Sequence, residues 1–306
     1  MNQYQKRIFT GIFYALFSGV IWGICGILGE YFFNHYQVSS GWITSTRLVI
    51  AGVCVLLLSA RQNGMAIFDI WKDKGNYLPF LAYAILGVFS VQFFFYLCIE
   101  SSNAATATIL QFISPVFILV YNHLMKRQRA SKLAVCYIAL AMLGVTLMAT
   151  KGDFSSLAIT PFALATGLLS AVAVGFNVIL PQRFAKRYGF INTVGWGMLL
   201  AGLLSNTLYP VTRLTFSLDW VSVIIILTIA LFGTALSFLV SMKAASLVSP
   251  LIVSVIGASE PLSSALLSVL FLGLQMDWLL VTAMFLVVVP MVFLSIEESK
   301  SGQKIH

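Results

Sequence analysis

The two charged side chains best placed for chemistry are Glu260 and Arg47, because each lies inside a long apolar stretch. Pro261 follows Glu260 and lacks an N–H group, so the carbonyl of Gly257 loses its helical hydrogen bond. A carboxyl group beside opened backbone can bind an amine or carry a coupling proton; a protonated glutamate bonded to a neighbouring helix is the alternative. Arg47 stays charged, so it can bind a carboxylate, pair with Glu30 or Glu260, or reach towards water.

Several uncharged polar and aromatic side chains share this apolar setting. Gln111 lies four residues before Pro115, so it is next to a freed backbone carbonyl, and Asn177 has the same relation to Pro181. Each amide can orient a ligand or join two helices by hydrogen bonds. The remaining candidates are Gln92 and Tyr96, which are one helical turn apart, and Trp22 and Trp196, whose rings either pack between helices or form an aromatic cavity wall.

Motifs for other chemistries are absent from the sequence. It contains no GxxxxGK[ST] loop for ATP, no HExxH metal motif and no paired aspartates. The three histidines are far apart, and the four cysteines share no metal-type spacing. We therefore expect neither an enzyme nor a metal site or cofactor.

The elements that must position the candidate residues are membrane-spanning helices. Only 9% of the residues are charged, against about 25% in a soluble domain, and the mean hydropathy is +0.95. This composition excludes a soluble enzyme, a nucleic-acid-binding domain and a disordered chain. Ten apolar runs have about the 20 residues that cross a bilayer. They are 10–33, 41–60, 77–99, 103–125, 133–150, 159–182, 191–212, 219–242, 249–272 and 278–296.

The runs form two similar halves, residues 1–150 and 151–306, with five runs in each. Because five is odd, the second half must enter the membrane from the opposite side, as inverted-topology repeats do. The sequence thus predicts an all-α polytopic membrane protein with a single membrane domain, 1–306, made of ten helices in two inverted five-helix repeats. The segments that align without gaps are Gly87–Pro115 on Gly233–Pro261, at an offset of 146 residues, and Ser18–Glu30 on Ser170–Gln182, at an offset of 152.

The basic residues predict the orientation of this domain. If the N-terminus is cytoplasmic, 15 of the 18 Lys and Arg residues face the cytoplasm, two face outwards and Arg47 lies within a run. Cytoplasmic connections carry the excess of Lys and Arg in membrane proteins. Both termini are therefore predicted to be cytoplasmic in a multi-pass protein of the cell membrane.

A family resemblance is carried by loose motifs in a fixed order. The first half contains FSGVIWGICGILG, TSTRLVIAG and NAATATILQFISPV, and the second contains LLSAVAVGFNVILP and KAASLVSPLIVSVIGASEPLSSALLSVLFLG. Together they resemble the EamA-type transporters of the drug/metabolite transporter superfamily over essentially the whole chain. The resemblance implies a ten-helix inverted-repeat carrier of small metabolites, often amino acids, with its cavity formed mainly by helices 1–4 and 6–9. Gln275 stands where the family commonly has Glu, which excludes proton coupling by an acid at that position.

These features predict a secondary transporter that moves an amino acid or a related zwitterion by alternating access. Arg47 would bind the carboxylate, and Glu260 would bind the amine or carry a proton. The alternatives are a membrane-embedded enzyme and a passive channel. An enzyme would need a clustered nucleophile, base or metal site, and none is visible; a channel would need a continuous polar path, whereas the polar residues here cluster at mid-depth. The expected partners are the small-molecule substrate and the lipid bilayer, without nucleic acid, and the expected state is a monomer or homodimer.

Overall fold

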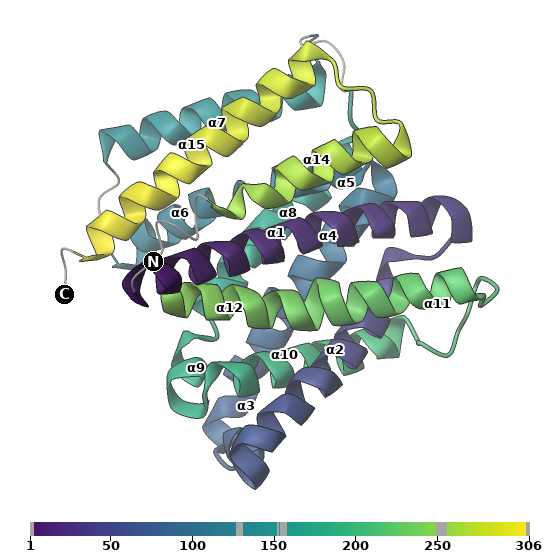
Figure 1. Ribbon diagram of the computed structural model, residues 1–306, viewed down its shortest axis with the longest axis vertical. Coiled ribbons are helices and arrows are strands. Elements are labelled where there is room, and N and C mark those ends of the chain that lie inside the picture. Colours follow the sequence, from purple (N-terminus) through teal and green to yellow (C-terminus); the bar gives the residue numbers. More distant parts are fainter. Residues whose placement is uncertain (1–2, 127–130, 152, 154–157, 249–255, 304–306) are drawn as a thin grey trace.

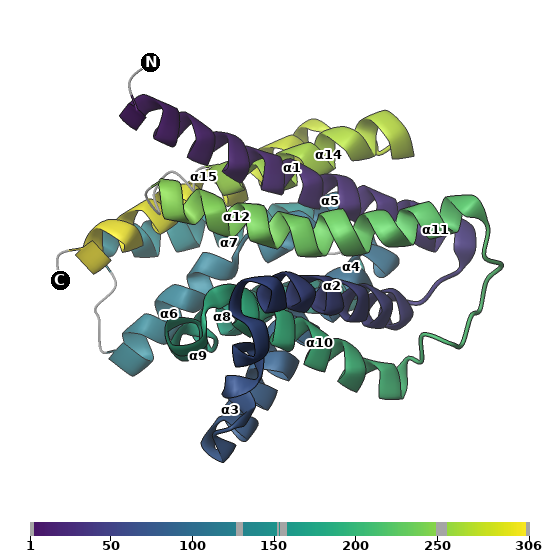
Figure 2. The ribbon, with the colours of Figure 1, turned by 60° about the horizontal axis from the view of Figure 1, so that its bottom comes forward.

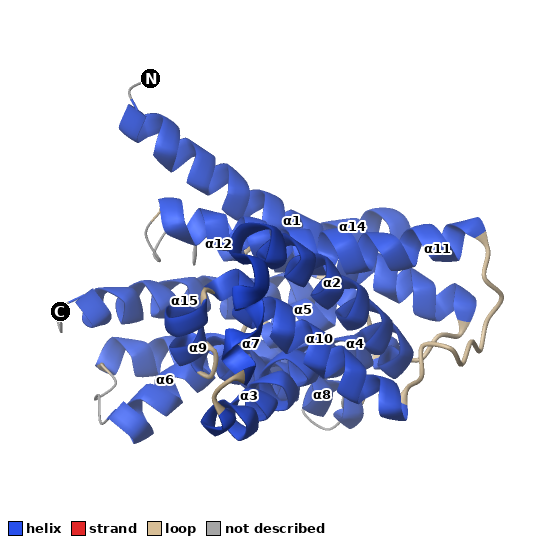
Figure 3. Ribbon diagram, turned by 90° about the horizontal axis from the view of Figure 1, so that it is seen from below, coloured by secondary structure: helices blue, strands red, loops and turns tan. Residues whose placement is uncertain are grey.

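The computed structural model describes residues 3–126, 131–151, 153, 158–248 and 256–303 of the chain. Within these residues all regular secondary structure is helical (Figures 1 and 3). The α-helices are α1 (Gln3–Tyr36), α2 (Ser40–Asn63), α3 (Tyr77–Ala82), α4 (Ser90–Ser101), α5 (Ala104–Gln111), α6 (Ser114–Lys126), α7 (Lys132–Thr150), α8 (Pro161–Ile179), α9 (Gln182–Tyr188), α10 (Phe190–Leu208), α11 (Trp220–Leu227), α12 (Ser237–Leu247), α14 (Ser259–Leu272) and α15 (Trp278–Gln303). The other helical segments are the 3₁₀ segments η1 (Gly64–Trp71) and η2 (Lys74–Asn76) and the π-helical segments η3 (Tyr83–Phe89) and η4 (Thr228–Leu236).

Many of these segments join into longer apolar helices. Within the described part of the chain, seven segments are long and apolar enough to cross a membrane. They are Gln5–Tyr36, Ser40–Trp71, Lys74–Ser101, Ala104–Met125, Lys132–Thr150, Pro161–Tyr188 and Trp220–Leu247, and two shorter apolar helices are Ser259–Leu272 and Trp278–Leu294. Residues 249–255 of the predicted run 249–272 lie outside the described residues. The chain is a polytopic helical membrane protein, as its composition predicts.

The helices pack into a bundle. α1 lies between α12 and α14, and α8 packs against α4 and α5 (Figures 1 and 2). α2 and α10 pack along each other, and α7 and α15 form a pair at one side of the bundle (Figure 1). The first residues of α1 and the last residues of α15 lie at one end of the bundle, whereas the connection 209–219 lies at the opposite end (Figure 2).

Glycines bring α2 and α10 close together. A Cβ atom on Gly202 would lie 2.7 Å from the backbone N of Val49, and a Cβ atom on Gly52 would lie 2.7 Å from the Cα of Leu199. Such small residues let helix backbones meet inside lipid, where van der Waals packing is a main source of association. Gly52 and Gly202 are 150 residues apart, as are Val49 and Leu199, so the two contacts are reciprocal.

The helix breaks predicted at three prolines are present. The predicted run 103–125 divides into α5 and α6 just before Pro115. α8 ends shortly before Pro181, which precedes the first residue of α9. A turn at Ala258 comes directly before α14, whose third residue is Pro261. Each break opens backbone hydrogen bonding inside an apolar helix.

The π-helical segments η3 and η4 lie in runs for which the sequence predicts regular helix. Gly87 in η3 and Gly233 in η4 are equivalent in the 146-residue alignment. π-helical turns are rare in proteins overall, but those that occur are often at functional sites. Side-chain hydroxyls donate to carbonyls five residues earlier, in the bonds Ser90 to Ile85 at 2.8 Å, Thr234 to Ile229 at 3.0 Å and Ser237 to Phe232 at 2.6 Å.

Candidate functional site

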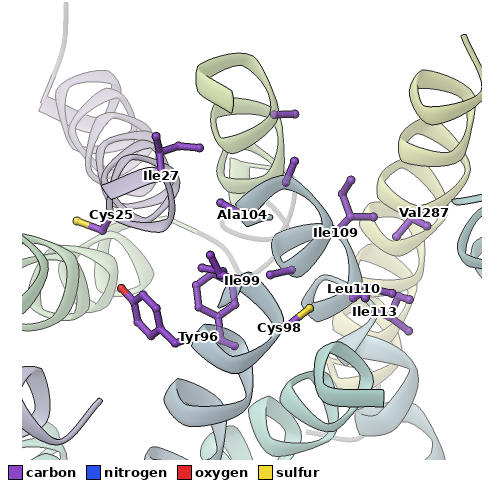
Figure 4. Close-up of a cluster of buried hydrophobic side chains, with 14 of the residues drawn as sticks. Cys25, Ile27, Tyr96, Cys98, Ile99, Ala104, Ile109, Leu110, Ile113 and Val287 are labelled. Carbon is purple, nitrogen blue, oxygen red and sulfur yellow. The ribbon is translucent and has the colours of Figure 1, made fainter. Parts of the chain in front are cut away.

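A cavity of about 340 Å³ lies between α1, α2, α4, α5, α8, η4, α12 and the start of α14. Seven of the eight side chains proposed from the sequence line it, namely Trp22, Arg47, Gln92, Tyr96, Gln111, Asn177 and Glu260. Tyr96 also belongs to an apolar cluster that includes Ile99 and Leu110 (Figure 4). The polar side chains therefore share one cavity that is backed by a packed apolar core.

Arg47 is buried in the cavity wall, with 3% of its surface exposed. Its Nε donates to Thr234 Oγ1 at 2.8 Å, and its Nη2 donates to the carbonyl of Gly233 at 3.4 Å. The guanidinium lies 4.8 Å from the centroid of the Tyr96 ring, at cation–π distance. Neither ion pair considered from the sequence forms among the described residues, because the Glu30 carboxylate accepts from the backbone N of Ala104 at 2.7 Å. Arg47 thus holds a positive charge without an acidic partner among the residues that the structure describes.

Glu260 lies in the first turn of α14, directly after the break at Ala258. The exposed N–H groups at a helix N-terminus favour a nearby negative charge. α14 packs closely on α1 here, since a Cβ atom on Gly23 would lie 3.1 Å from the carbonyl oxygen of Glu260. The Glu260 carboxyl group has no hydrogen bond or ion pair with another described residue, so the predicted alternative of a bond to a neighbouring helix finds no partner there.

The two amides beside proline breaks have different surroundings. Gln111 donates from Nε2 to the hydroxyl of Ser170, which itself donates to the carbonyl of Val91 at 3.3 Å. Gln111 therefore joins α5 to α8 as well as lining the cavity. The Oδ1 atom of Asn177 is buried without a hydrogen-bond partner among the described residues. Buried polar atoms are usually satisfied, so a ligand or water donor is expected at this atom.

The two tryptophan candidates have different surroundings. Trp22 lines the cavity and meets Phe238 edge to face at 5.6 Å between ring centroids. Trp196 lies outside the cavity lining, and its Nε1 donates to the carbonyl of Ile67 at 2.8 Å. Its ring also meets Trp71 edge to face at 5.3 Å. Packing, one of the two alternatives raised for each indole, therefore describes Trp196.

Sequence reasoning missed several lining residues. Phe112 lies three residues before Pro115, in the helix break, so the nearby proline could have indicated it as a cavity residue. Cys25 and Phe238 carried no such signal, because cysteine and phenylalanine are ordinary residues of an apolar helix. Gly233 reaches the cavity through its backbone in a π-helical segment, a feature that the residue pattern does not encode.

Aromatic side chains pack together at the bundle end opposite Gln3 and Gln303. We call Phe32, Tyr36, Trp42 and Phe216 the Phe216 cluster. Phe216 meets the other three rings edge to face at centroid distances of 5.4, 6.1 and 5.1 Å. Trp42 Nε1 donates to the carbonyl of Val211 at 3.1 Å.

A carboxylate anchors the same end. The Tyr36 hydroxyl donates to both carboxylate oxygens of Asp219, at 3.1 and 3.0 Å. Asp219 caps α11, and its hydrogen bond from the backbone N–H of Ser222 holds the pKa of the carboxyl group below its ordinary value. The charged cap and the ring contacts together fix the connection 209–219 against α1 and α2.

Comparison with known proteins places the chain among membrane transporters. The model of the EamA-like transporter family matches residues 9–150 and 161–296. The uncharacterized inner membrane transporter YicL of Salmonella typhimurium is 35% identical over 272 residues, which cover 88% of this chain and 90% of that protein. The threonine/homoserine exporter RhtA of Escherichia coli K12 is 25% identical over 241 residues, or 77% and 75% of the two chains. A protein of known crystal structure shares the fold, with a TM-score of 0.64 and 15% identity over 98% of this chain and 99% of that one.

Proposed function

The chain belongs to the EamA-like transporter family, and we propose that it moves an amino acid or a related zwitterion across the cell membrane by alternating access. Its relatives are named as transporters, so it is a membrane transporter and not an enzyme. One relative is named as an exporter of threonine and homoserine, which points to amino acids as the substrate class. The passive channel is the alternative that the experiment below addresses.

The placement of Arg47 and Glu260 on one cavity carries this proposal. Neither side chain has an oppositely charged partner among the described residues. An uncompensated buried charge is costly, and a ligand that brings the opposite charge offsets that cost. A zwitterion does so twice, because its carboxylate can bind Arg47 and its ammonium can bind Glu260. Gln92, Tyr96 and the Oδ1 atom of Asn177, which has no partner among the described residues, can donate or accept further hydrogen bonds.

Glu260 is also the proposed coupling residue. Its carboxyl group lines the cavity and lacks a fixed partner among the described residues, so it can exchange a proton with the cavity. Proton relays in membrane transporters use acidic groups placed in this way. Coupling requires that protonation and substrate binding at Glu260 compete, because both neutralise the same carboxylate.

The proposed scaffold is ten helices in two inverted repeats, 1–150 and 151–306. Packing supports it, since α1 packs on α12 as α8 packs on α4, and α2 packs on η4 as α10 packs on η3. Equivalent residues also line the cavity in pairs. At offsets of 152 and 146 residues these pairs are Trp22 and Val174, Cys25 and Asn177, Gly26 and Val178, Gln92 and Phe238, Gln111 and Gly257, and Ser114 and Glu260. The family model likewise matches one segment in each half.

Both termini are proposed to be cytoplasmic. α6, α9 and α12 lie near the bundle end that carries the first residues of α1 (Figures 2 and 3). The sequences of these helices contain Lys or Arg residues. Cysteines at Asn34 and Lys132, introduced singly on a cysteine-free background, test this orientation in intact cells with an impermeant reagent. Labelling at position 34 alone supports the proposal, and labelling at position 132 alone reverses it.

Counterflow in proteoliposomes tests the function. Vesicles loaded with unlabelled threonine, alanine or phenylalanine are given the radiolabelled compound outside, with a matched amine, carboxylic acid and nucleoside in parallel. We expect saturable uptake of at least one amino acid that rises when the same compound is inside, and loss of it in Arg47→Met. Trp196→Phe is the matched control, because Trp196 lies outside the cavity lining. Uptake that neither saturates nor responds to internal substrate would indicate a channel.

A further inference from the structure

We infer that Thr234 is a positioning residue that orients Arg47 towards the substrate carboxylate; this rests on the proposed function. Thr234 is fully buried in η4. Its hydroxyl donates to the carbonyl of Ile229 at 3.0 Å and accepts from Arg47 Nε at 2.8 Å. A hydroxyl has one proton, so the bond to Ile229 commits that proton and leaves a lone pair directed at Arg47.

The next residue along η4 adds a second contact. The carbonyl of Gly233 accepts from Arg47 Nη2 at 3.4 Å. Gly233 also has no room for a side chain, because a Cβ atom there would lie 2.7 Å from the Cβ of Cys25. A guanidinium has five N–H donors in a planar fork, so fixing two of them sets the plane in which the others can meet a carboxylate.

The other half of the chain provides an internal comparison. The counterpart of Thr234 at the 146-residue offset is Val88, which has a similar shape and no hydroxyl. The reciprocal contacts of α2 and α10 give Arg47 the counterpart Gly197. The ring of Tyr83 fills the space beside Gly197, since a Cβ atom there would lie 3.1 Å from Tyr83 Cζ. Of the two equivalent positions, 88 and 234, only position 234 carries a hydroxyl, and only this position has an arginine beside it.

A purely local role does not account for this pairing. Ser90 and Ser237 make the same type of hydroxyl bond to a carbonyl five residues earlier, and neither contacts Arg47 in these bonds. If the Thr234 hydroxyl served only to bond the π-helical backbone, its presence would be unrelated to Arg47. The bond from Arg47 Nε makes the hydroxyl a link between η4 and α2.

The test compares substrates with and without a carboxylate. Thr234→Val removes the hydroxyl and keeps the shape, Thr234→Ser keeps the hydroxyl, and Val88→Thr adds a hydroxyl at the counterpart position. Purified variants are reconstituted in proteoliposomes, and binding is measured by competition. The affinity for threonine is compared with that for threoninamide, and the affinity for phenylalanine with that for phenylalaninamide. We expect Thr234→Val to weaken amino-acid binding by about tenfold, the cost of one hydrogen bond to a charged group, and to leave amide binding unchanged. Thr234→Ser and Val88→Thr should bind both members of each pair as the parent does.

A second measurement does not depend on substrate. In protein labelled with ¹⁵N at arginine side chains, the Arg47 Nε–H resonance, assigned by its loss in Arg47→Lys, should exchange slowly with water in the parent and in Thr234→Ser. It should exchange quickly in Thr234→Val. Loss of this protection without a change in amino-acid selectivity overturns the positioning role, as does equal weakening of amino acids and amides. If the parent binds no amino acid, the proposed function fails. If Arg47 Nε–H also exchanges slowly in Thr234→Val, Thr234 does not hold Arg47, and the positioning role fails as well.

Discussion

In the proposed alternating-access cycle, the Phe216 cluster would separate when the bundle opens at that end. Phe216→Ala removes the ring that contacts Phe32, Tyr36 and Trp42. It leaves the hydrogen bond from Trp42 to Val211 in place. Because the lost contacts join the connection 209–219 to α1 and α2, the substitution should destabilise the closed state more than the open state.

The ring geometry sets the size of this effect. Each edge-to-face pair contributes about 0.5–1.5 kcal/mol beyond the area that it buries. Phe216 is half-buried and its three contacts overlap, so we take about 1.5–3 kcal/mol for the whole ring. Since about 1.4 kcal/mol is a tenfold change in an equilibrium constant, Phe216→Ala should shift the population towards the open state by about 10- to 100-fold.

Cys25 provides the assay, because it lines the cavity and is buried, with 3% of its surface exposed. On a background in which the other three cysteines are replaced, an impermeant thiol reagent is applied to right-side-out and to inside-out vesicles. The labelling rate of Cys25 from the side of the Phe216 cluster should rise by about the same 10- to 100-fold, provided that opening limits labelling. Labelling from the opposite side should fall.

Two comparisons make the result decisive. Phe285→Ala removes a largely exposed ring of α15, with 62% of its surface exposed, and should leave both labelling rates unchanged. Phe216→Leu keeps an apolar side chain without ring geometry and should give an intermediate rate. Unchanged Cys25 labelling in a folded, transporting Phe216→Ala protein would refute the view that this cluster holds the closed state.

Three other changes test the site and the scaffold. Glu260→Gln should weaken substrate affinity, because the neutral amide can accept a hydrogen bond from the ammonium but lacks the opposite charge, and net transport in proteoliposomes should lose its response to an imposed pH gradient. Arg47→Lys keeps the charge and loses the planar fork, so substrate affinity should fall about tenfold or more while thermal stability stays near that of the parent. Gly52→Ala should lower stability by about 1–3 kcal/mol in thermal unfolding, because its Cβ would meet the backbone of Leu199. Gly175→Ala, whose Cβ would meet no atom closer than 3.8 Å, is the matched control and should be neutral.

The sequence predicts which polar residues line the cavity far better than it predicts what those residues contact. Polar groups inside lipid are costly, so Gln111, Asn177 and Glu260 stand out against apolar surroundings. Prolines mark the broken helices independently of packing, because the missing N–H is a property of the residue. Those two signals identified the charged and amide side chains of the cavity lining but not its apolar residues.

Direction around a helix could not be predicted in the same way. The rise per residue gives the depth of Arg47, and on depth alone Glu30 and Glu260 were reasonable partners. The structure instead pairs Arg47 with Thr234 and Glu30 with a backbone N–H, because neighbouring helices and their rotation decide which groups meet. Trp196 illustrates the same limit, since it lies within an apolar run as Trp22 does, but its side chain contacts Ile67 and does not line the cavity.

The proposed repeat explains why the cavity has symmetric walls and asymmetric chemistry. Rocking of two equivalent halves requires that each half offer a similar packing surface, and the reciprocal glycine contacts of α2 and α10 meet that need. A zwitterion, however, has two different ends. A cavity with the same polar groups in both halves would bind it equally well in two opposite orientations. This equivalence is absent because the counterpart of Arg47 is Gly197 and that of Glu260 is Ser114. In the proposed binding mode, a zwitterion would therefore take a single orientation, with its carboxylate at Arg47 and its ammonium at Glu260.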